Sequence, residues 1–288
     1  MGKRPRGGPA PGLNPWIRLG TGPLTFFDPN LYALGLASAL GLGVIAWLLH
    51  IPRRNAGVAD SFWSIFFLVL AALYALAGPL ASDRALLVLL LVTLWAVRLS
   101  AFITRRNWGA PEDRRYAAMR AANDPGFWWK SLFLVFALQA VLAWIISLPL
   151  LAAMLGTSPL GWLDYAALGL WLIGLFFEAV GDQQMADFRA RPENRGSVMD
   201  RGLWRYTRHP NYFGEACIWW GFYLFALAAG GWWTLVSPIL VTWLLLRVSG
   251  VALLERDIGE RRPAYGDYIS RTNAFIPGPP RVRRRQEA

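Results

Sequence analysis

The most unusual group of polar side chains in this 288-residue sequence lies between Gly202 and Glu215, immediately before an apolar segment. In chain order the group contains Arg205, Tyr206, Arg208, His209, Asn211, Tyr212 and Glu215. Because proline has no backbone N–H and cannot lie mid-helix without breaking a backbone hydrogen bond, Pro210 indicates a turn, with a helix that starts at Asn211 or just after. A helix N-terminus beside arginines suits an anion, although a basic loop lying on anionic lipid explains the arginines equally well. Asn211 and Glu215 lie one helical turn apart, and burying them unpaired in a membrane is unfavourable, so we predict a ligand site here.

Two further polar clusters follow apolar segments. In the first, Glu178, Asp182 and Arg189 recur at intervals of four and seven, which places them on one face of a continuing helix. They suit hydrogen bonding to the sugars and phosphates of a nucleotide, and an exposed ladder of ion pairs is the alternative. The second cluster contains Glu255, Arg256, Asp257, Arg261, Arg262, Tyr265 and Tyr268. An amphipathic helix at the membrane interface explains its spacing equally well.

Polar residues in the first half of the chain open, interrupt or follow apolar segments. One loop contains Arg105, Arg106, Asn107, Trp108, Glu112, Asp113, Arg114, Arg115 and Tyr116. Asp60 opens one apolar segment, and Arg98 lies inside the next. A charge within a membrane helix extends to water or pairs with another charge. We therefore expect Arg98 to extend toward water or to pair with Asp60.

The composition excludes several kinds of chemistry. Cys217 is the only cysteine, so neither a disulfide within the chain nor a multi-thiolate metal site can form. His50 and His209 are the only histidines, and we predict no metal site. The sequence lacks Gly-x-Gly-x-x-Gly, Walker, Gly-x-Ser-x-Gly and zinc-type spacings. The net charge of +11 is dispersed among loops, so we expect no nucleic-acid partner.

The chain is too apolar for a water-soluble domain, with 55% hydrophobic and 16% charged residues. A membrane-spanning helix needs about 20 mainly apolar residues. That pattern occurs at Leu31–Leu49, Ser61–Leu80, Ala85–Ile103, Ser131–Leu155, Gly161–Val180, Glu215–Ala229 and Trp232–Leu254. We therefore predict an all-α integral membrane protein with about seven transmembrane helices in contact with membrane lipid.

The distribution of basic residues predicts the orientation. Lysine and arginine gather after the first, third, fifth and seventh segments, whereas the even-numbered connections hold little beyond Arg84. The positive-inside rule puts the C-terminus in the cytoplasm and the N-terminus outside, and four basic residues of the N-terminal tail argue against it. We expect residues 1–25 to form a disordered basic tail, 26–280 a single seven-helix domain, and 281–288 a basic C-terminal tail.

The run Arg208–Glu215 resembles the C-terminal signature of the steroid 5α-reductase superfamily, most closely its bacterial steroid 5α-reductase-like branch. The similarity continues through Glu112–Tyr116, Phe188–Gly196, Tyr265–Tyr268 and Ala274–Pro277, and covers roughly residues 60–280. The resemblance implies a multi-pass protein of the bacterial inner membrane, which we expect to be a monomer. It also implies that NADPH binds among the last three helices, within 161–280, and that the first four, within 31–155, enclose an apolar substrate cavity.

The resemblance further implies roles for individual residues. Asp182 and Arg189 match cofactor-contacting positions, and Asn211 and Glu215 match the Asn-x-x-x-Glu pair of the sixth helix. The expected NADPH contacts are Arg106, Asp182, Arg189, Asn194, Arg205, Arg208, His209, Asn211, Glu255, Asp257 and Tyr268. As a loop residue, Arg208 is expected to contribute little to packing. The implied reaction is reduction of a C=C bond in a hydrophobic steroid or other lipid-like enone.

Hydride addition to an enone places negative charge on the carbonyl oxygen, so a donor must stabilise that charge and supply a proton. The steroid enzymes of the superfamily use a Gln-Glu pair and a tyrosine. The comparable stretches here, Arg54–Asp60 and Leu94–Ala96, contain no such trio. A carboxyl buried in low dielectric tends to stay protonated near neutral pH and can donate. Our candidate catalytic residues are Glu215 and Tyr212, followed by Asp60 and Tyr116, and the alternative role for Glu215 is to accept a hydrogen bond from the nicotinamide amide.

Two other functions are compatible with the sequence. Isoprenylcysteine and phospholipid methyltransferases also carry an Arg-His-Pro-x-Tyr element, and they bind S-adenosylmethionine. Glu255-Arg256 stands where those enzymes usually have two glutamates, and the continuation Asn211–Glu215 favours a reductase. The second alternative is a non-enzymatic lipid-binding membrane protein.

Overall fold

The computed structural model describes residues 27–77, 82–248, 250–255 and 263–281, and these ranges contain helices and loops but no strand. Five helices are long and apolar enough to cross a membrane: α1 (Pro29–Arg53), α2 (Val58–Ala77), α3 (Asp83–Asn107), the segmented helix Phe127–Leu155, and α8 (Trp162–Ala190). The prediction of an all-helical membrane protein is confirmed for these ranges, whereas the number of seven spans and the orientation stay predictions. The expected tail of residues 1–25 lies outside the described residues, and of the expected tail 281–288 only Arg281 is described.

The remaining elements are shorter. The segmented helix consists of α5 (Phe127–Ser131), the π-helical η1 (Leu132–Ala137), α6 (Leu138–Ile146) and α7 (Leu148–Leu155). The last part of the bundle consists of α9 (Pro210–Ala228), η4 (Trp232–Leu235), α10 (Val236–Trp243), the π-helical η5 (Leu244–Val248) and α11 (Val251–Glu255). The connections contain α4 (Arg114–Asn123), η2 (Pro192–Asn194), η3 (Gly202–Arg205) and α13 (Tyr265–Arg271).

The fifth, sixth and seventh predicted spans differ from the observed helices in instructive ways. The fifth was expected to end at Val180, but α8 continues to Ala190 and so carries the polar cluster that follows. The sixth span was expected over Glu215–Ala229 with its helix starting at Asn211 or just after, but α9 begins at Pro210, because proline is tolerated in the first turn of a helix. The polar residues of α9 keep it out of the five clearly apolar helices. The seventh contains a shorter apolar helix over Trp232–Val248.

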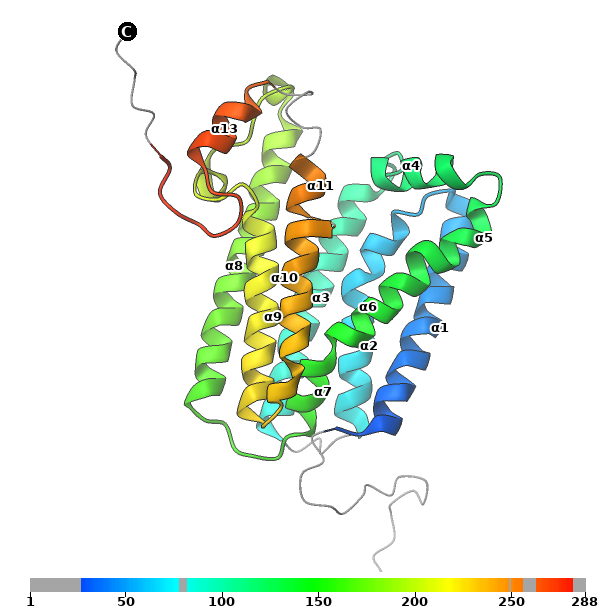
Figure 1. Ribbon diagram of the computed structural model, residues 1–288, viewed down its shortest axis with the longest axis vertical. Helices are drawn as coiled ribbons and strands as arrows, with labels where there is room; N and C mark the ends of the chain where they lie inside the picture. Colours follow the sequence, from blue (N-terminus) through cyan, green and yellow to red (C-terminus); the bar gives the residue numbers. More distant parts are fainter. Residues whose placement is uncertain (1–26, 78–81, 249, 256–262, 282–288) are drawn as a thin grey trace, which may run out of the picture.

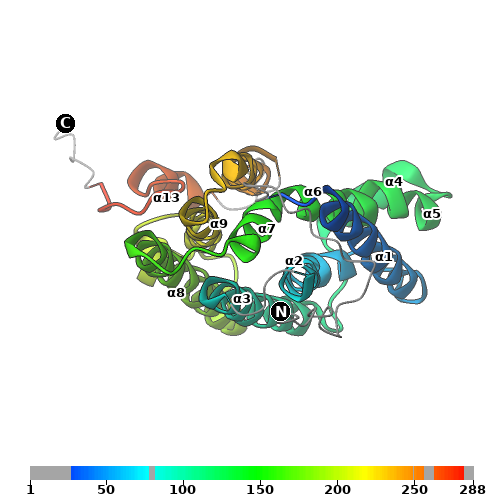
Figure 2. The same cartoon turned by 90° about the horizontal axis from the view of Figure 1, so that it is seen from below.

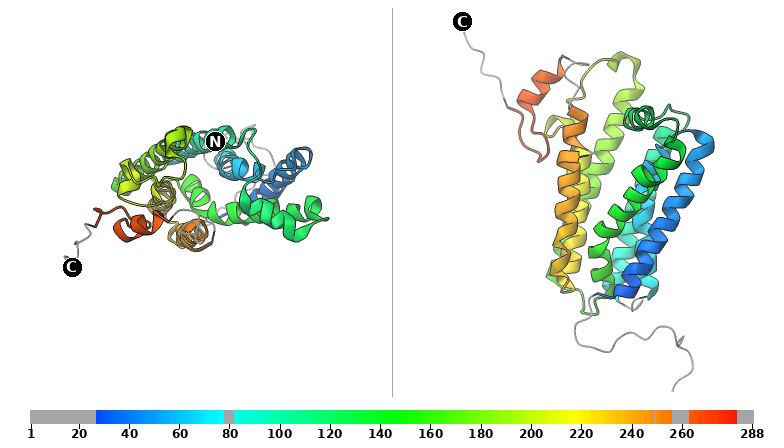
Figure 3. Two further views of the ribbon diagram at one scale, coloured as in Figure 1. Left: turned by 90° about the horizontal axis from the view of Figure 1, so that it is seen from above. Right: turned by 45° about the vertical axis from the view of Figure 1, so that its right-hand side comes forward.

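The helices form two rows when the bundle is viewed along its length (Figure 2). One row contains α8, α3, α2 and α1, and the other contains α9, α7 and α6. The start of α9 and the ends of α3 and α8 lie at the same end of the bundle as α4, α11 and α13 (Figures 1 and 3). Segments distant in sequence therefore bring their polar residues to one end.

The helices α8 and α9 make the most extensive contact in the bundle. Gly174 and Gly214 face each other there: a Cβ at Gly174 would lie 2.6 Å from the Gly214 carbonyl oxygen and 2.7 Å from the Ile218 nitrogen. Small residues let membrane helices approach backbone to backbone. These glycines therefore fix the separation of α8 and α9, and with it the positions of the polar side chains that both helices carry.

A buried ion pair fastens the opposite end of the bundle. Arg84 at the start of α3 donates to both carboxyl oxygens of Asp164, at 2.7 and 2.9 Å, near the start of α8. Arg84 also donates to the carbonyls of Ser158 and Pro159 and to the Ser158 hydroxyl. Arg84 is thus a structural residue rather than a loop cation of the kind that the positive-inside rule counts.

Candidate functional site

A chain of polar contacts crosses α3, α8 and α9. Arg98 of α3 approaches Glu178 at 2.8 Å and Asp182 at 3.1 Å, both on α8. Asn211 of α9 donates its side-chain N–H to the other carboxyl oxygen of Asp182 across 3.3 Å. The predicted pairing of Arg98 with Asp60 is wrong, because two carboxylates one turn apart on α8 hold the guanidinium. The predicted common face of Glu178 and Asp182 is confirmed.

The side-chain oxygen of Asn211 is an unsatisfied acceptor. It is buried and has no hydrogen-bond partner among the described residues. Because its amide nitrogen already donates to Asp182, the free atom is the carbonyl oxygen. A buried acceptor without a partner is unfavourable and calls for a donor, which a ligand can provide.

Glu215 and Tyr212 lie on α9 beside α2. The indole N–H of Trp63 on α2 donates to one carboxyl oxygen of Glu215 across 3.3 Å. The second carboxyl oxygen of Glu215 and the hydroxyl of Tyr212 make no hydrogen bond within the described part of the chain, and both residues are partly buried. The charged groups that act electrostatically on the Tyr212 phenol are those of Arg115, Glu215, Asp60 and Arg106. Two polar groups on one helix are therefore free to contact a ligand.

Asp60 and Tyr116 form a second polar pair at the same end of the bundle. The Tyr116 hydroxyl on α4 donates to Asp60 on α2 across 2.6 Å and accepts a hydrogen bond from the Gln139 amide across 3.3 Å. Arg115 contacts the other carboxyl oxygen of Asp60 at 2.9 Å. Burial and the neighbouring charge of Asp60 raise the pKa of Tyr116. The two second-choice catalytic residues are thus brought together, with the tyrosine proton engaged by the aspartate.

Five other residues join the loop before α9 to the C-terminal segment, and we call them the C-terminal latch: Arg208, His209, Glu255, Tyr265 and Tyr268. Glu255 accepts two hydrogen bonds from Arg208, at 2.7 and 2.9 Å, and is 2.9 Å from the His209 ring. Arg208 also donates to the carbonyls of Ile269 and Thr272. The Tyr268 hydroxyl donates to the Trp204 carbonyl.

The latch corrects the expectation that Arg208 contributes little to packing. Arg208 is buried, and its guanidinium holds a carboxylate and two backbone carbonyls that lie more than 40 residues further along the chain. Burial of Glu255 favours a higher pKa, but the hydrogen bonds from His209 and Arg208 outweigh it and lower the pKa to about 2. The role of Arg208, His209, Glu255 and Tyr268 as NADPH contacts stays a prediction.

The other predicted cofactor contacts lie around this end of the bundle. Arg106, Arg189 and Arg205 are exposed, and Arg106 donates to the side-chain oxygen of Asn107. Asn194 donates to the Phe188 carbonyl and so fastens η2 to the end of α8. Asp257 lies outside the described residues.

Sequence reasoning missed three residues that hold the candidate side chains. Trp63 donates to Glu215, Trp95 donates to Glu178 across 3.0 Å, and Gln139 donates to Tyr116. Trp63 lies three residues after Asp60 and Trp95 three residues before Arg98, so helical spacing from the polar residues already identified was the available signal. Gln139 had no such signal, because it is distant in sequence from every partner.

The helical bundle and its polar end define a multi-pass membrane protein with a candidate ligand site between α2, α4, α8 and α9. The family described as "Protein of unknown function (DUF1295)" matches residues 46–272, and the chain belongs to this family, which is part of the steroid 5α-reductase-like superfamily. The chain is also similar to "Uncharacterized protein C594.04c" of Schizosaccharomyces pombe, with 29% identity over 293 residues, covering 89% of this chain and 84% of the relative. No solved structure matches. The resemblance to the superfamily is thereby confirmed.

Proposed function

We propose that this protein is an NADPH-dependent reductase of the bacterial steroid 5α-reductase-like branch, acting on the C=C bond of a hydrophobic steroid or other lipid-like enone. The observation that carries the proposal is the position of Glu215 and Tyr212. They lie on α9, in the half expected to hold the cofactor, and Glu215 contacts Trp63 in the half expected to hold the substrate. A hydride donor and an acceptor bound in the two halves would meet beside these two side chains.

The proposed topology has seven spans, with α9 and Trp232–Leu254 added to the five membrane-length helices. The polar end then faces the cytoplasm of a bacterial cell, because α4 and the segment that joins α8 to α9 carry many of the arginines. This orientation gives a cytoplasmic dinucleotide access to the site and leaves the apolar flanks of α1 to α7 for a substrate from the lipid phase.

The residues present fit a dinucleotide. The unsatisfied acceptor of Asn211 suits the N–H of a carboxamide. Arg106 is exposed and lies near enough to influence both Asp182 and Tyr212, so it is our first choice for a phosphate. When bound, NADPH supplies the hydride.

The protein's own side chains would stabilise the negative charge on the carbonyl oxygen and supply the proton. The Tyr212 hydroxyl and the second Glu215 oxygen are the available groups for holding a carbonyl oxygen as negative charge develops on it. Tyr116 is less suited to give up its proton, since its hydroxyl donates to Asp60. We assign the Asp60–Tyr116 pair a positioning role, in which Arg115 and Gln139 hold it against α2.

Ligand-dependent stabilisation of the purified protein tests this proposal. Thermal unfolding should shift upward with NADPH, and less with NADH, because arginines select the 2′-phosphate. Stabilisation by S-adenosylmethionine and not by NADPH would favour the methyltransferase. A response to neither would favour a non-enzymatic lipid-binding protein.

A further inference from the structure

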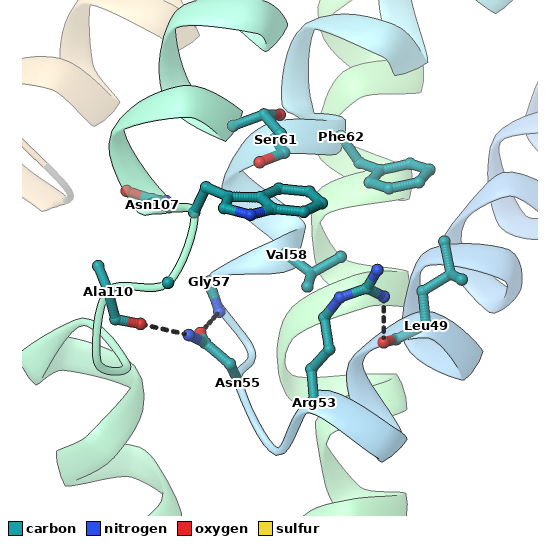
Figure 4. A pocket seen from close by; sticks show the side chains of 12 residues that line it. Leu49, Arg53, Asn55, Gly57, Val58, Ser61, Phe62, Asn107 and Ala110 are labelled. Carbon is teal, nitrogen blue, oxygen red and sulfur yellow. Dashed lines mark hydrogen bonds between the residues drawn. The ribbon is translucent and has the colours of Figure 1, made fainter.

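A pocket of about 470 Å³ lies at the polar end of α1, α2 and α3, and it does not include the candidate site residues (Figure 4). Its polar lining includes Arg53, Asn55 and Asn107, and its apolar lining includes Leu49, Val58 and Phe62. A volume of this size is typical of small-molecule sites. None of the described residues that line it is acidic, so the pocket favours an anion over a cation.

Two donors in the lining are available to such an anion. The Arg53 guanidinium makes one hydrogen bond, from Nη1 to the Leu49 carbonyl at 3.0 Å, and its other N–H groups have no partner among the described residues (Figure 4). The Asn107 side-chain oxygen accepts from Arg106, which leaves its amide N–H groups for a ligand. Asn55 is already used to shape the pocket, because it accepts from the Gly57 N–H at 2.9 Å.

The depth of the pocket identifies the kind of anion. Leu49 and Arg53 lie one turn apart on α1, about 6 Å along its axis. The preceding turn of α1 is apolar and exposed, with Ile45 and Leu48 each 52% exposed. Trp108, which also lines the pocket, is 78% exposed, as suits an indole at the boundary of headgroups and hydrocarbon. The pocket therefore extends from hydrocarbon depth to headgroup depth.

We propose that this pocket binds one anionic phospholipid, with its phosphate at Arg53 and Asn107 and the start of its chains along Leu49 and Phe62. Arginine and an amide donor match phosphate oxygens, and the apolar wall matches the glycerol and first methylene groups. None of the described residues that line this pocket is a candidate reductase residue, and the proposal does not depend on that function.

Lipid titration of the purified, delipidated protein tests the proposal, with bound lipids counted by native mass spectrometry. Wild-type protein should bind phosphatidylglycerol in preference to phosphatidylcholine. Arg53→Gln should weaken phosphatidylglycerol binding about tenfold, the effect of one charge-assisted hydrogen bond, and leave phosphatidylcholine unchanged. Val58→Glu should also weaken phosphatidylglycerol binding, because it puts a negative charge in the lining while Arg53 is unchanged. A carboxylate in the first turn of α2 is itself favourable for the helix.

Arg54→Gln is the matched control, because it removes the same charge from the neighbouring residue, whose side chain does not line the pocket. It should bind lipid as the wild type does. Wild-type affinity in both Arg53→Gln and Val58→Glu, or an equal loss in Arg54→Gln, overturns the proposal. Equal binding of soluble glycerol phosphate would overturn the assignment of the ligand as a lipid.

Discussion

Trp63 on α2 and Glu215 on α9 are 152 residues apart in sequence, and the indole N–H of one donates to the carboxyl of the other across 3.3 Å. Only one oxygen of Glu215 is used in this contact. The hydrogen bond therefore orients the carboxyl while leaving its second oxygen for a ligand, which is the arrangement that an acid or a hydrogen-bonding group in a substrate site requires.

Replacing Glu215 with Gln separates the two roles considered for this residue. If Glu215 supplies a proton, Glu215→Gln keeps NADPH affinity and loses enone-dependent NADPH oxidation by about 100-fold or more. If it accepts from the nicotinamide amide, affinity and turnover fall together. Full activity would exclude both roles. Trp63→Phe is the companion variant, and it should impair turnover less, since it removes only the group that orients the carboxyl.

Adding one methyl group at Gly174 should destabilise the bundle. The new Cβ would meet backbone atoms of α9 at 2.6 and 2.7 Å, and these atoms cannot rotate away. Overpacking of this kind costs about 1–3 kcal/mol, so the thermal midpoint of Gly174→Ala should fall by several degrees. Gly169→Ala is a matched control on the same helix, because a Cβ there meets nothing within 4 Å. Equal midpoints for the two variants would contradict the close helix approach.

The C-terminal latch should weaken in acid. Glu255 has a pKa of about 2, below its ordinary 4.5, so the folded state favours the ionised carboxylate. The stability that it contributes is fully present above about pH 4.5 and is lost as the pH falls toward 2. Thermal midpoints of wild type and Glu255→Gln should therefore differ near pH 6, and the difference should close as the pH falls through this range.

Glu193→Gln is the control for this experiment, since Glu193 is an exposed carboxylate on η2. Its midpoint should follow that of the wild type at every pH. A constant gap between wild type and Glu255→Gln from pH 6 to pH 3 would show that the latch does not depend on ionised Glu255.

The membrane class, a helix start within a residue or so of Pro210 and the shared face of Glu178 and Asp182 were predictable, because each follows from hydropathy, the missing N–H of proline or helical spacing within one segment. The partners of Arg98 were not, since whether it contacts α2 or α8 depends on how separate helices pack. The role of Arg208 was misjudged for the same reason. Its partner Glu255 is 47 residues away, and nothing local shows that the segment between them returns.

The backbone-to-backbone contact of Gly174 with Gly214 also bears on motion. Sliding α9 along α8 would drive Ile218 or the Gly214 carbonyl into the facing chain, so this close contact favours movement of the two helices as one unit. Asp182 and Asn211 keep their alignment within it. For the ligand proposed beside Glu215, the wall that can move to admit it is then the opposite one, formed by α2 and α4. The Trp63–Glu215 hydrogen bond is the point at which such a gate would part.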